Sequence, residues 1–351
     1  MAAPYAGDVT TRKSFGSDNH AGAHPAVLQA LADANTGDSM PYGTDPWSAQ
    51  AAATLRAAAG AQGAFFVFNG TGANLLGLSL LQRHPYDAVI CPASSHLNVD
   101  ECGACERALG IKLLPVGVPD GKLTPDIIVE WLAERGDEHR PQPNMVAISQ
   151  VTELGTCYTL EELGKLSDFC RGNDLLLFMD GARLANAAAY LGCGLADLAG
   201  HADVLTFGGT KNGALGAEAV LVMRDELTTE VPYHRKQLTQ LGSKLRFVSA
   251  QFNGLLDDDL WLHNARHANA MAQRLAGRIQ DLPGLEILHT VESNAVFATF
   301  EPHWIAELQP EWHFNVWPSG KNVVRLMTAF NTTVTDVDDF AAAIGTVATK
   351  R

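Results

Sequence analysis

Lys211 lies in a glycine-rich segment that directly follows a short apolar run. The run at residues 204–207 predicts a buried strand, and Gly208, Gly209 and Thr210 connect it to the lysine. Because burial disfavours the charged ammonium, we expect a confined Lys211 to have a lowered pKa. A neutral lysine amine can form a Schiff base with an aldehyde. Taken alone, the segment fits an exposed lysine in a glycine-rich turn equally well.

A second glycine-rich segment follows another predicted strand. Residues 64–68 predict the strand, residues 69–74 read Asn-Gly-Thr-Gly-Ala-Asn, and a helix is expected over residues 75–82. Backbone N–H groups in such a turn, next to a helix N-terminus, can bind a phosphate. The segment lacks the Gly-Lys-Ser/Thr of a P-loop and the glycine spacing of a dinucleotide site. A phosphate site at residues 70–72 and a plain tight turn both remain open.

Short apolar strands alternate with helices along most of the chain. This alternation predicts an α/β fold with a mostly parallel sheet and right-handed crossovers. In such sheets the ligand site lies outside the carboxyl ends of the strands. The features at that edge are the turn at 70–72, His96, Asp180 with Arg183, and Lys211. The expected strands are 88–91, 111–116, 145–149 and 175–179, and the expected helices are 97–109, 124–134 and 159–171.

The chain is long enough for two domains. Its 351 residues exceed the size of most single cores. We expect a large domain over residues 17–250 and a smaller α+β domain that combines residues 1–16 with residues 251–351. The elements expected in the smaller domain are a helix at 261–282, strands at 285–288, 295–300 and 323–327, and a last helix that begins at Asp336 with Thr335 as its cap.

Composition restricts the partners and the compartment. The net charge of −14 argues against nucleic-acid binding, which relies on clustered Lys and Arg. No apolar run is long enough to span a membrane, and residues 1–11 lack the apolar core of a signal peptide. We therefore expect a soluble cytoplasmic protein with its six cysteines reduced. The Cys102/Cys105 pair stands alone, which favours two thiols in the first turns of a helix over a redox pair or a zinc site, and no metal site is expected.

Four of these features together provide what pyridoxal phosphate (PLP) requires of a protein. PLP needs a lysine for a Schiff base, a carboxylate at its pyridine nitrogen and a phosphate-binding turn, and a flat side chain usually stacks on its ring. The matching residues, in that order, are Lys211, Asp180, the turn at 70–72 and His96. Asp180 alone would more often be a strand-end cap, so only the complete set favours a cofactor site.

The same residues carry a resemblance to a known family. The chain resembles the low-specificity L-threonine aldolases, which are fold type I (aspartate aminotransferase-like) PLP enzymes. The resemblance extends over essentially the whole chain and implies that fold for the large domain. The matching motifs are Ser17-Asp-Asn with Ala-His-Pro25, Tyr42-Gly-Thr-Asp-Pro46, Gly70-Thr71, His96 with Glu101, Asp180-Gly-Ala-Arg183, Lys211 and Arg325.

The resemblance implies a role for each motif. Lys211 would carry PLP, Asp180 would pair with the pyridine nitrogen, and His96 would stack on the ring. The implied cofactor-binding residues are Gly70, Thr71, Gly72, His96, Asp180, Arg183 and Lys211. The implied substrate-binding residues are Ser17, Asn19, Arg183 and Arg325. Arginine suits a substrate carboxylate because its planar fork makes two parallel hydrogen bonds.

The chain departs from the family pattern at two positions. Many members have a histidine where this chain has Glu153, and an aromatic residue is common at the position of Asp100. Both side chains should face the β-substituent of the substrate. We expect His96 to remove the β-hydroxyl proton, since imidazole titrates near neutrality. A water held by His96, Asp100 or Glu153 comes second, and His139 in a polar loop is a weaker candidate. The predicted catalytic residues are Lys211, His96, Asp100 and Glu153.

The resemblance implies PLP-dependent aldol cleavage of L-threonine or L-allo-threonine to glycine and an aldehyde. A phenylserine-type aldolase and a β-eliminating lyase are alternatives, because PLP carries the chemistry in all of them. A PLP-binding protein without activity is the non-enzymatic alternative. The expected partner is a small-molecule amino acid, and the family implies a homodimer or homotetramer. The basic segment Arg235-Lys236 could then reach a neighbour's cofactor phosphate, or form a basic surface helix.

Overall fold

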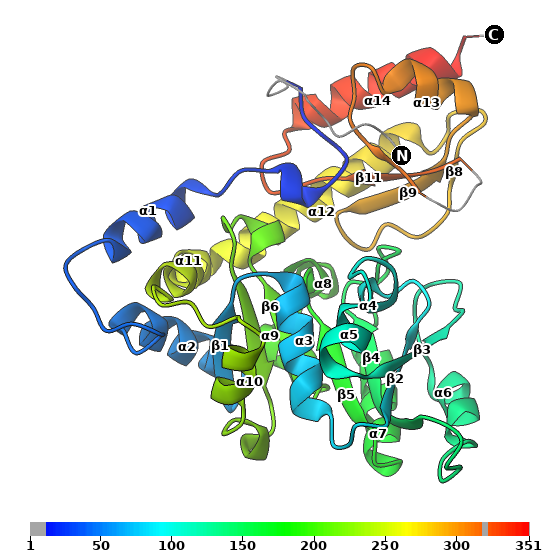
Figure 1. Cartoon of the computed structure of the whole chain (residues 1–351). Helices are drawn as coiled ribbons and strands as arrows, with labels where there is room; N and C mark the ends of the chain where they lie inside the picture. The colour runs from blue at the N-terminus through cyan, green and yellow to red at the C-terminus, as the bar shows by residue number, and fades with distance from the viewer. Residues whose placement is uncertain (1–11, 318–321, 351) are drawn as a thin grey trace.

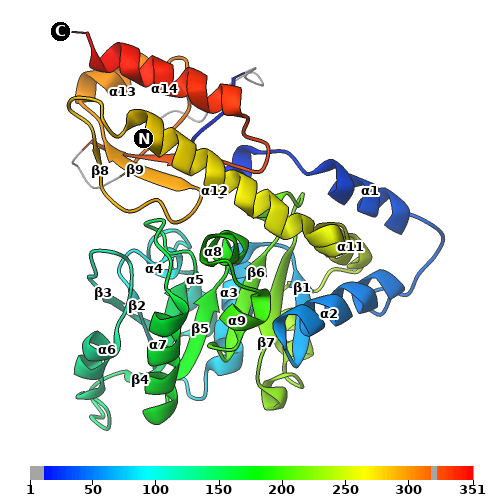
Figure 2. The same cartoon turned by 180° about the vertical axis from the view of Figure 1, so that it is seen from behind.

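The structure of the protein, a computed structural model, describes residues 12–317 and 322–350. The strands of its larger sheet are β1 (Gly63–Val67), β2 (Asp87–Pro92), β3 (Lys112–Val116), β4 (Gln142–Ser149), β5 (Leu176–Asp180), β6 (Val204–Gly208) and β7 (Glu218–Val222). Their order is β1-β7-β6-β5-β4-β2-β3 (Figures 1 and 2). β7 pairs antiparallel with β6 and β1, and the other pairs are parallel. The predicted α/β fold with a mostly parallel sheet is confirmed.

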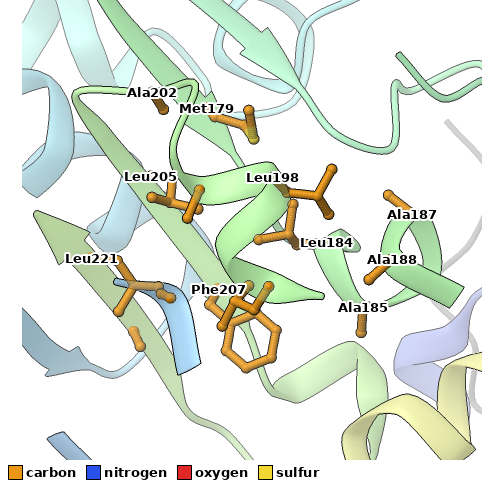
Figure 3. Packing of buried hydrophobic residues seen from close by; sticks show 14 of the residues in the cluster. Met179, Leu184, Ala185, Ala187, Ala188, Leu198, Ala202, Leu205, Phe207 and Leu221 are labelled. Carbon is orange, nitrogen blue, oxygen red and sulfur yellow. The ribbon is translucent and has the colours of Figure 1, made fainter. Parts of the chain in front are cut away.

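Helices cover both faces of this sheet. They are α3 (Gly70–Leu81), α4 (His96–Val99), α5 (Ala104–Leu109), α6 (Pro125–Leu132), α7 (Leu160–Gly172), α8 (Leu184–Leu191), α9 (Leu195–Ala199) and α10 (Val231–Gln237). α3 and α5 lie in front of the sheet in Figure 1, and α7, α8 and α9 lie in front of it in Figure 2. Successive strand side chains point to opposite faces, so Phe178 packs on the α3 side and Met179 on the other. Figure 3 shows the packing on the Met179 side of the sheet, where Met179 and Leu205 lie near Leu198 of α9.

A second, antiparallel sheet lies nearer the C-terminus. Its strands are β8 (Glu286–Ile287), β9 (Ala295–Thr299), β10 (Asn315–Val316) and β11 (Val323–Met327), in the order β10-β11-β9-β8. Three helices share an apolar cluster with it: the long α12 (Leu260–Ile279), α13 (Pro302–Leu308) and α14 (Val334–Ala348). Phe15 joins this cluster, and its N–H donates to the His313 carbonyl at 2.8 Å. Figures 1 and 2 show α12 running from the larger sheet to the smaller one.

Along the chain, the remaining helices lie before β1, between β6 and β7, and between β7 and β8. They are α1 (Pro25–Ala34), α2 (Pro46–Ala59), α11 (Arg246–Leu256) and the 3-10 helices η1 (Asp18–His20), η2 (Thr210–Asn212), η3 (Asp225–Leu227) and η4 (Asp257–Asp259). The domain boundary predicted at residue 250 falls inside α11, and we keep it as a proposal supported by the two separate sheets. Phe15 supports grouping the N-terminal arm with the smaller sheet, while residues 1–11 of that arm lie outside the described residues.

Near the predicted site, the bounds of two helices differ from those predicted. α3 begins at Gly70, because the Asn69 side chain caps the segment expected to be a turn. The helix expected over 97–109 is divided into α4 and α5, since Cys102 and Gly103 adopt positive φ angles of 52° and 69° between them. Cys102 therefore precedes α5, and Cys105 lies in its first turn.

The last helix begins earlier than its predicted start at Asp336. Thr333 is its cap, not Thr335, because Thr333 and Asp336 form a reciprocal capping box. Among the helices of the described residues, none is long and apolar enough to cross a membrane.

Candidate active site

A cavity opens at the carboxyl ends of β4, β5 and β6, the edge where parallel sheets bind ligands. The predicted site residues that line it are Gly70, His96, Glu153, Asp180, Arg183 and Lys211. A neighbouring cavity shares Gly70, His96 and Lys211 and adds Asn19 and Thr71. The structure thus brings most of the predicted residues together from separate strand ends.

Lys211 lies in η2, just past the end of β6. Gly208 lets this strand end approach the backbone of Ala182, because a Cβ at Gly208 would lie 2.6 Å from the Ala182 carbonyl oxygen. The pKa of Lys211 is lowered, first by the positive charge of Arg183 and then by burial. A lowered pKa was expected from burial alone, and the arginine charge adds the larger part. Both effects favour the neutral, nucleophilic amine.

Two intermediate side chains connect Asp180 to His96. The Asn74 amide donates to Asp180 Oδ2 at 2.8 Å and to Glu101 Oε1 at 2.7 Å. Glu101 Oε1 in turn lies 2.8 Å from His96 Nδ1. This hydrogen bond raises the pKa of His96, against the opposing effect of burial. Asp180 and the Nδ1 edge of the imidazole are therefore both oriented by neighbours.

Arg183 is held by a carboxylate from the N-terminal segment. Its Nε and Nη2 donate to Asp18 Oδ2 and Oδ1 at 2.7 and 2.9 Å. Asn294, just before β9, donates to Asp18 Oδ2 at 3.0 Å. Burial opposes ionisation of Asp18, but the Arg183 charge and these hydrogen bonds prevail, and the pKa of Asp18 is lowered to about 2. Asp18 leaves the Nη1 end of Arg183 unengaged.

Glu153 is a buried carboxyl in the cavity wall. Its Oε1 accepts hydrogen bonds from the Ser149 hydroxyl at 2.6 Å and the His96 backbone N–H at 2.8 Å. Its buried Oε2 has no hydrogen-bond partner within the described part of the chain. Burial raises the pKa of Glu153. One oxygen is thus anchored while the other is available to a ligand.

The N-terminus of α3 offers a phosphate site. The Asn69 side chain accepts the Gly72 N–H at 2.8 Å, and helix geometry leaves the N–H groups of Gly70 and Thr71 without partners inside the helix. Open space lies where a Cβ of Gly70 would project. Gly72 has a packing role instead, since its Cβ would lie 2.3 Å from the Gln240 side chain. With an amine and a buried carboxylate on the same cavity, the residues fit PLP.

Four predicted residues lie outside the walls of these two cavities, namely Gly72, Ser17, Asp100 and Arg325. Ser17 begins η1, and its hydroxyl accepts the Asn19 N–H at 3.2 Å. Burial, aided by the Arg183 charge, lowers the pKa of Arg325 to about 10, and Asp100 acts in the opposite direction. Asp100 is therefore electrostatically coupled to Arg325.

Some contacts of the site were not assigned from the sequence. Asp18 lies within a recognised motif and Asn74 ends the glycine-rich segment, but no local pattern marks Asn294. His139 lies in an exposed segment, where its backbone N–H donates to Asp137 at 2.9 Å. Over the described ranges, no group of three or more His, Cys, Asp or Glu side chains is arranged to hold a metal ion.

Comparisons with known proteins show which family the chain is related to. Residues 14–302 match the model of the beta-eliminating lyase family. A low-specificity L-threonine aldolase of a Pseudomonas sp. is 43% identical over 340 residues, which is 95% of this chain and 98% of that protein. The Pseudomonas aeruginosa protein of that name is 41% identical over 337 residues, which is 95% and 97% of the two chains.

A solved structure leads to the same group of enzymes. Leishmania major threonine aldolase matches with a TM-score of 0.89 and 32% identity, over 95% of this chain and 99% of that chain. This match agrees with the expected fold type I architecture. The chain therefore belongs to the beta-eliminating lyase family, the group of PLP enzymes that includes the low-specificity L-threonine aldolases.

Proposed function

We propose that this protein cleaves the Cα–Cβ bond of L-threonine and L-allo-threonine to give glycine and an aldehyde. One observation carries the proposal: a single cavity is lined by the Lys211 amine, the Asp180 carboxylate and the Arg183 guanidinium. These groups are suited to a PLP-dependent reaction of an amino acid. The names of the similar proteins support aldol cleavage over β-elimination and over a preference for phenylserine.

PLP is the cofactor, and when bound it accepts the electron pair of the broken bond. We propose that Lys211 holds its aldehyde carbon and that Asp180 faces its pyridine nitrogen. The Asn74 amide orients Asp180 before any ligand arrives. The backbone N–H groups of Gly70 and Thr71 are proposed to bind its phosphate. His96 remains the candidate for the side chain that stacks on the PLP ring. Gly72 is proposed to support the turn by its close packing against Gln240.

The substrate carboxylate is proposed to bind between two arginines. Asp18 accepts one N–H from Nε and one from Nη2 of Arg183, so the N–H groups of Nη1 and the second N–H of Nη2 are left for the substrate. Arg325 adds a second positive charge, and its buried Nε has no partner within residues 12–317 and 322–350. Ser17 and Asn19 remain candidates for the edge of this subsite.

The β-hydroxyl proton needs a base, and the contacts favour Glu153. Its Oε2 is unpartnered, and its raised pKa brings the carboxyl closer to a neutral working pH, where proton exchange is efficient. The hydrogen bond to Glu101 raises the pKa of His96, so less of the imidazole is in the neutral form that can accept a proton. We assign Asp100 a charge role beside Arg325 and not that of a base.

We also propose that the protein works as a homodimer or homotetramer in the cytoplasm. Arg235 in α10 is buried, its Nη1 donates to the Phe66 carbonyl at 3.3 Å, and its Nε has no partner in the described part of the chain. A buried guanidinium requires an anion nearby. The cofactor phosphate of a neighbouring subunit is the proposed one, with Lys236 exposed beside it. The six free cysteines support a reducing compartment.

Product analysis tests the reaction. The purified protein with added PLP is offered L-threonine, L-allo-threonine and L-phenylserine separately. We expect glycine with the matching aldehyde, faster from the two threonines than from phenylserine. Ammonia with a 2-oxo acid would establish β-elimination instead. A Lys211→Ala variant that cleaved threonine at the wild-type rate would contradict the assigned site.

A further inference from the structure

Glu218 is a buried carboxyl at the cofactor site that the roles above do not use. It is the first residue of β7, is 6% exposed, and pairs in register with Gly208 of β6 and Val67 of β1. The phosphate-binding segment follows β1, and the segment with Lys211 follows β6. Glu218 lines the same cavity as Gly70 and Lys211. The carboxyl therefore lies between the proposed phosphate site and the catalytic lysine.

The surroundings of Glu218 favour a neutral carboxyl. Burial has the largest effect and raises the pKa of Glu218 to about 7, although hydrogen bonds with Thr210 and the charge of Lys211 lower it. Asp180 contributes in the raising direction. The elements packed on β7, which are β1, β6 and α3, contain no titratable side chain. The further titratable group in the cavity wall is His96.

A bound phosphate would be a second anion in this confined space. A phosphate monoester carries close to two negative charges at neutral pH and has strong acceptor oxygens. An ionised carboxylate can only accept hydrogen bonds, whereas a protonated carboxyl can donate one. Two like charges in one site oppose each other's ionisation. A proton on Glu218 would remove this repulsion and supply a donor to the phosphate.

We propose that Glu218 holds the phosphate end of PLP as a neutral carboxylic acid, and that cofactor binding transfers one proton from solvent to this side chain. A proton released by water or a buffer acid forms an O–H bond on one carboxylate oxygen, and no other bond of Glu218 forms or breaks. This inference rests on the PLP site of the proposed function and not on which substrate bond is cleaved.

Proton uptake on PLP binding tests the inference. PLP is added to apoprotein in weakly buffered solution that contains a pH indicator, for the wild type and for Glu218→Gln. At pH 8 the free carboxyl is mostly ionised, so the wild type should take up about one proton more than the variant, and at pH 6 the difference should fall to about 0.1. The Kd for PLP of the wild type, relative to the variant, should rise about tenfold between pH 6 and pH 8.

Two controls test whether the additional proton depends on the phosphate group and on the position of the substituted glutamate. Pyridoxal, which lacks the phosphate, should give equal proton uptake in the wild type and Glu218→Gln. The exposed Glu134→Gln change should leave the proton uptake on PLP binding as it is in the wild type. If Glu218→Gln does not fold, the wild type alone should still take up about one proton more with PLP than with pyridoxal at pH 8.

Equal uptake by the wild type and Glu218→Gln at pH 8 would overturn the inference, as would a Kd ratio that does not change with pH. Aldol cleavage is read out separately from binding. A protein that takes up the proton but cleaves no hydroxy amino acid would contradict the proposed function and leave the role of Glu218 standing. Cleavage without the additional proton would contradict the role of Glu218 alone.

Discussion

Arg183 and Asp18, 165 residues apart in the chain, form a two-point ion pair at 2.7 and 2.9 Å. The exposed fractions of the two side chains are 16% and 1%, so the pair is withdrawn from water. A buried pair needs further hydrogen bonds to offset desolvation, and Asn294 supplies one to Asp18 at 3.0 Å. The pair therefore links the N-terminal segment, the end of β5 and the region before β9 at the proposed carboxylate site.

The Asp18→Asn variant should lose both stability and substrate affinity. Removing one partner of a buried ion pair costs about 3–5 kcal/mol of unfolding free energy, because the other charge stays buried. A misplaced Arg183 should also raise KM for L-threonine about tenfold or more, the usual effect of losing a charged hydrogen bond. Denaturant unfolding and steady-state kinetics measure the two effects. An unchanged KM would show that Asp18 does not position Arg183 for the substrate.

The contribution of Asp18 to stability should depend on pH in one direction. Its pKa in the folded protein, about 2, lies below the ordinary aspartate value. The ionised group therefore stabilises the fold above about pH 4, and this stabilisation is lost as the pH falls toward 2. The difference in unfolding free energy between the wild type and Asp18→Asn should shrink over that range. The exposed Asp281→Asn change is the matched control and should show no such trend.

The Glu101→Gln variant should lower the pKa of His96. The hydrogen bond to Glu101 is the main cause of the raised value, so its loss should move the pKa toward about 6.5, as measured by NMR titration of the imidazole. A group whose pKa is raised by folding stabilises the folded protein at pH values below its pKa in the unfolded chain. This stabilisation is lost as the pH rises through its pKa in the folded protein. The wild type should thus exceed the variant in stability by more at pH 5.5 than at pH 8.5. An unmoved His96 titration would contradict this pairing.

The Glu153→Gln variant separates proton transfer from cofactor binding. The amide keeps the shape of the carboxyl but cannot accept the β-hydroxyl proton, so kcat should fall about 100-fold or more. The Kd for PLP should change little, because the amide oxygen can still accept the hydrogen bonds from Ser149 and the His96 backbone, and the residue is not at the phosphate turn. The exposed Glu134→Gln protein is the control for replacing a glutamate by glutamine at a position away from the site. A wild-type kcat in Glu153→Gln would return the role of base to His96.

Sequence patterns identify the parts of this site that lie at strand ends. Lys211 and Asp180 follow buried apolar strands, and parallel strands deliver their carboxyl ends to one edge, so their meeting was predictable. The pairing of Asp18 with Arg183 was not, because no periodic pattern connects residues 165 apart. The break between α4 and α5 could not be predicted from the sequence either, because Cys102 adopts a positive φ that its residue type does not favour.

Borohydride reduction in the presence of PLP should attach the cofactor to Lys211. The lowered pKa of this lysine leaves more of its amine neutral at pH 8 than for an exposed lysine. Peptide mass spectrometry should find the label on Lys211 in the wild type and lose it there in Lys211→Ala. The Lys165→Ala protein, which changes a lysine 66% exposed in an ion pair with Glu161, should be labelled as the wild type is. Equal labelling of several lysines would contradict a dedicated site.

The Gly181→Ala variant should be among the least tolerated changes near the site. A Cβ at Gly181 would lie 1.9 Å from the Thr206 carbonyl oxygen, a backbone atom that cannot move aside without shifting β6. Overpacking of this kind costs about 1–3 kcal/mol and occasionally more. We expect the upper end of that range, together with a weaker affinity for PLP, since Gly181 directly follows Asp180. Gly277→Ala in α12 is the matched control, because nothing lies within 4 Å of its added Cβ. Because Ala is favoured over Gly inside a helix, this control should gain about 0.5–1 kcal/mol of unfolding free energy. A lower denaturation midpoint for Gly181→Ala and a higher one for Gly277→Ala would therefore assign the loss to the contact between β5 and β6.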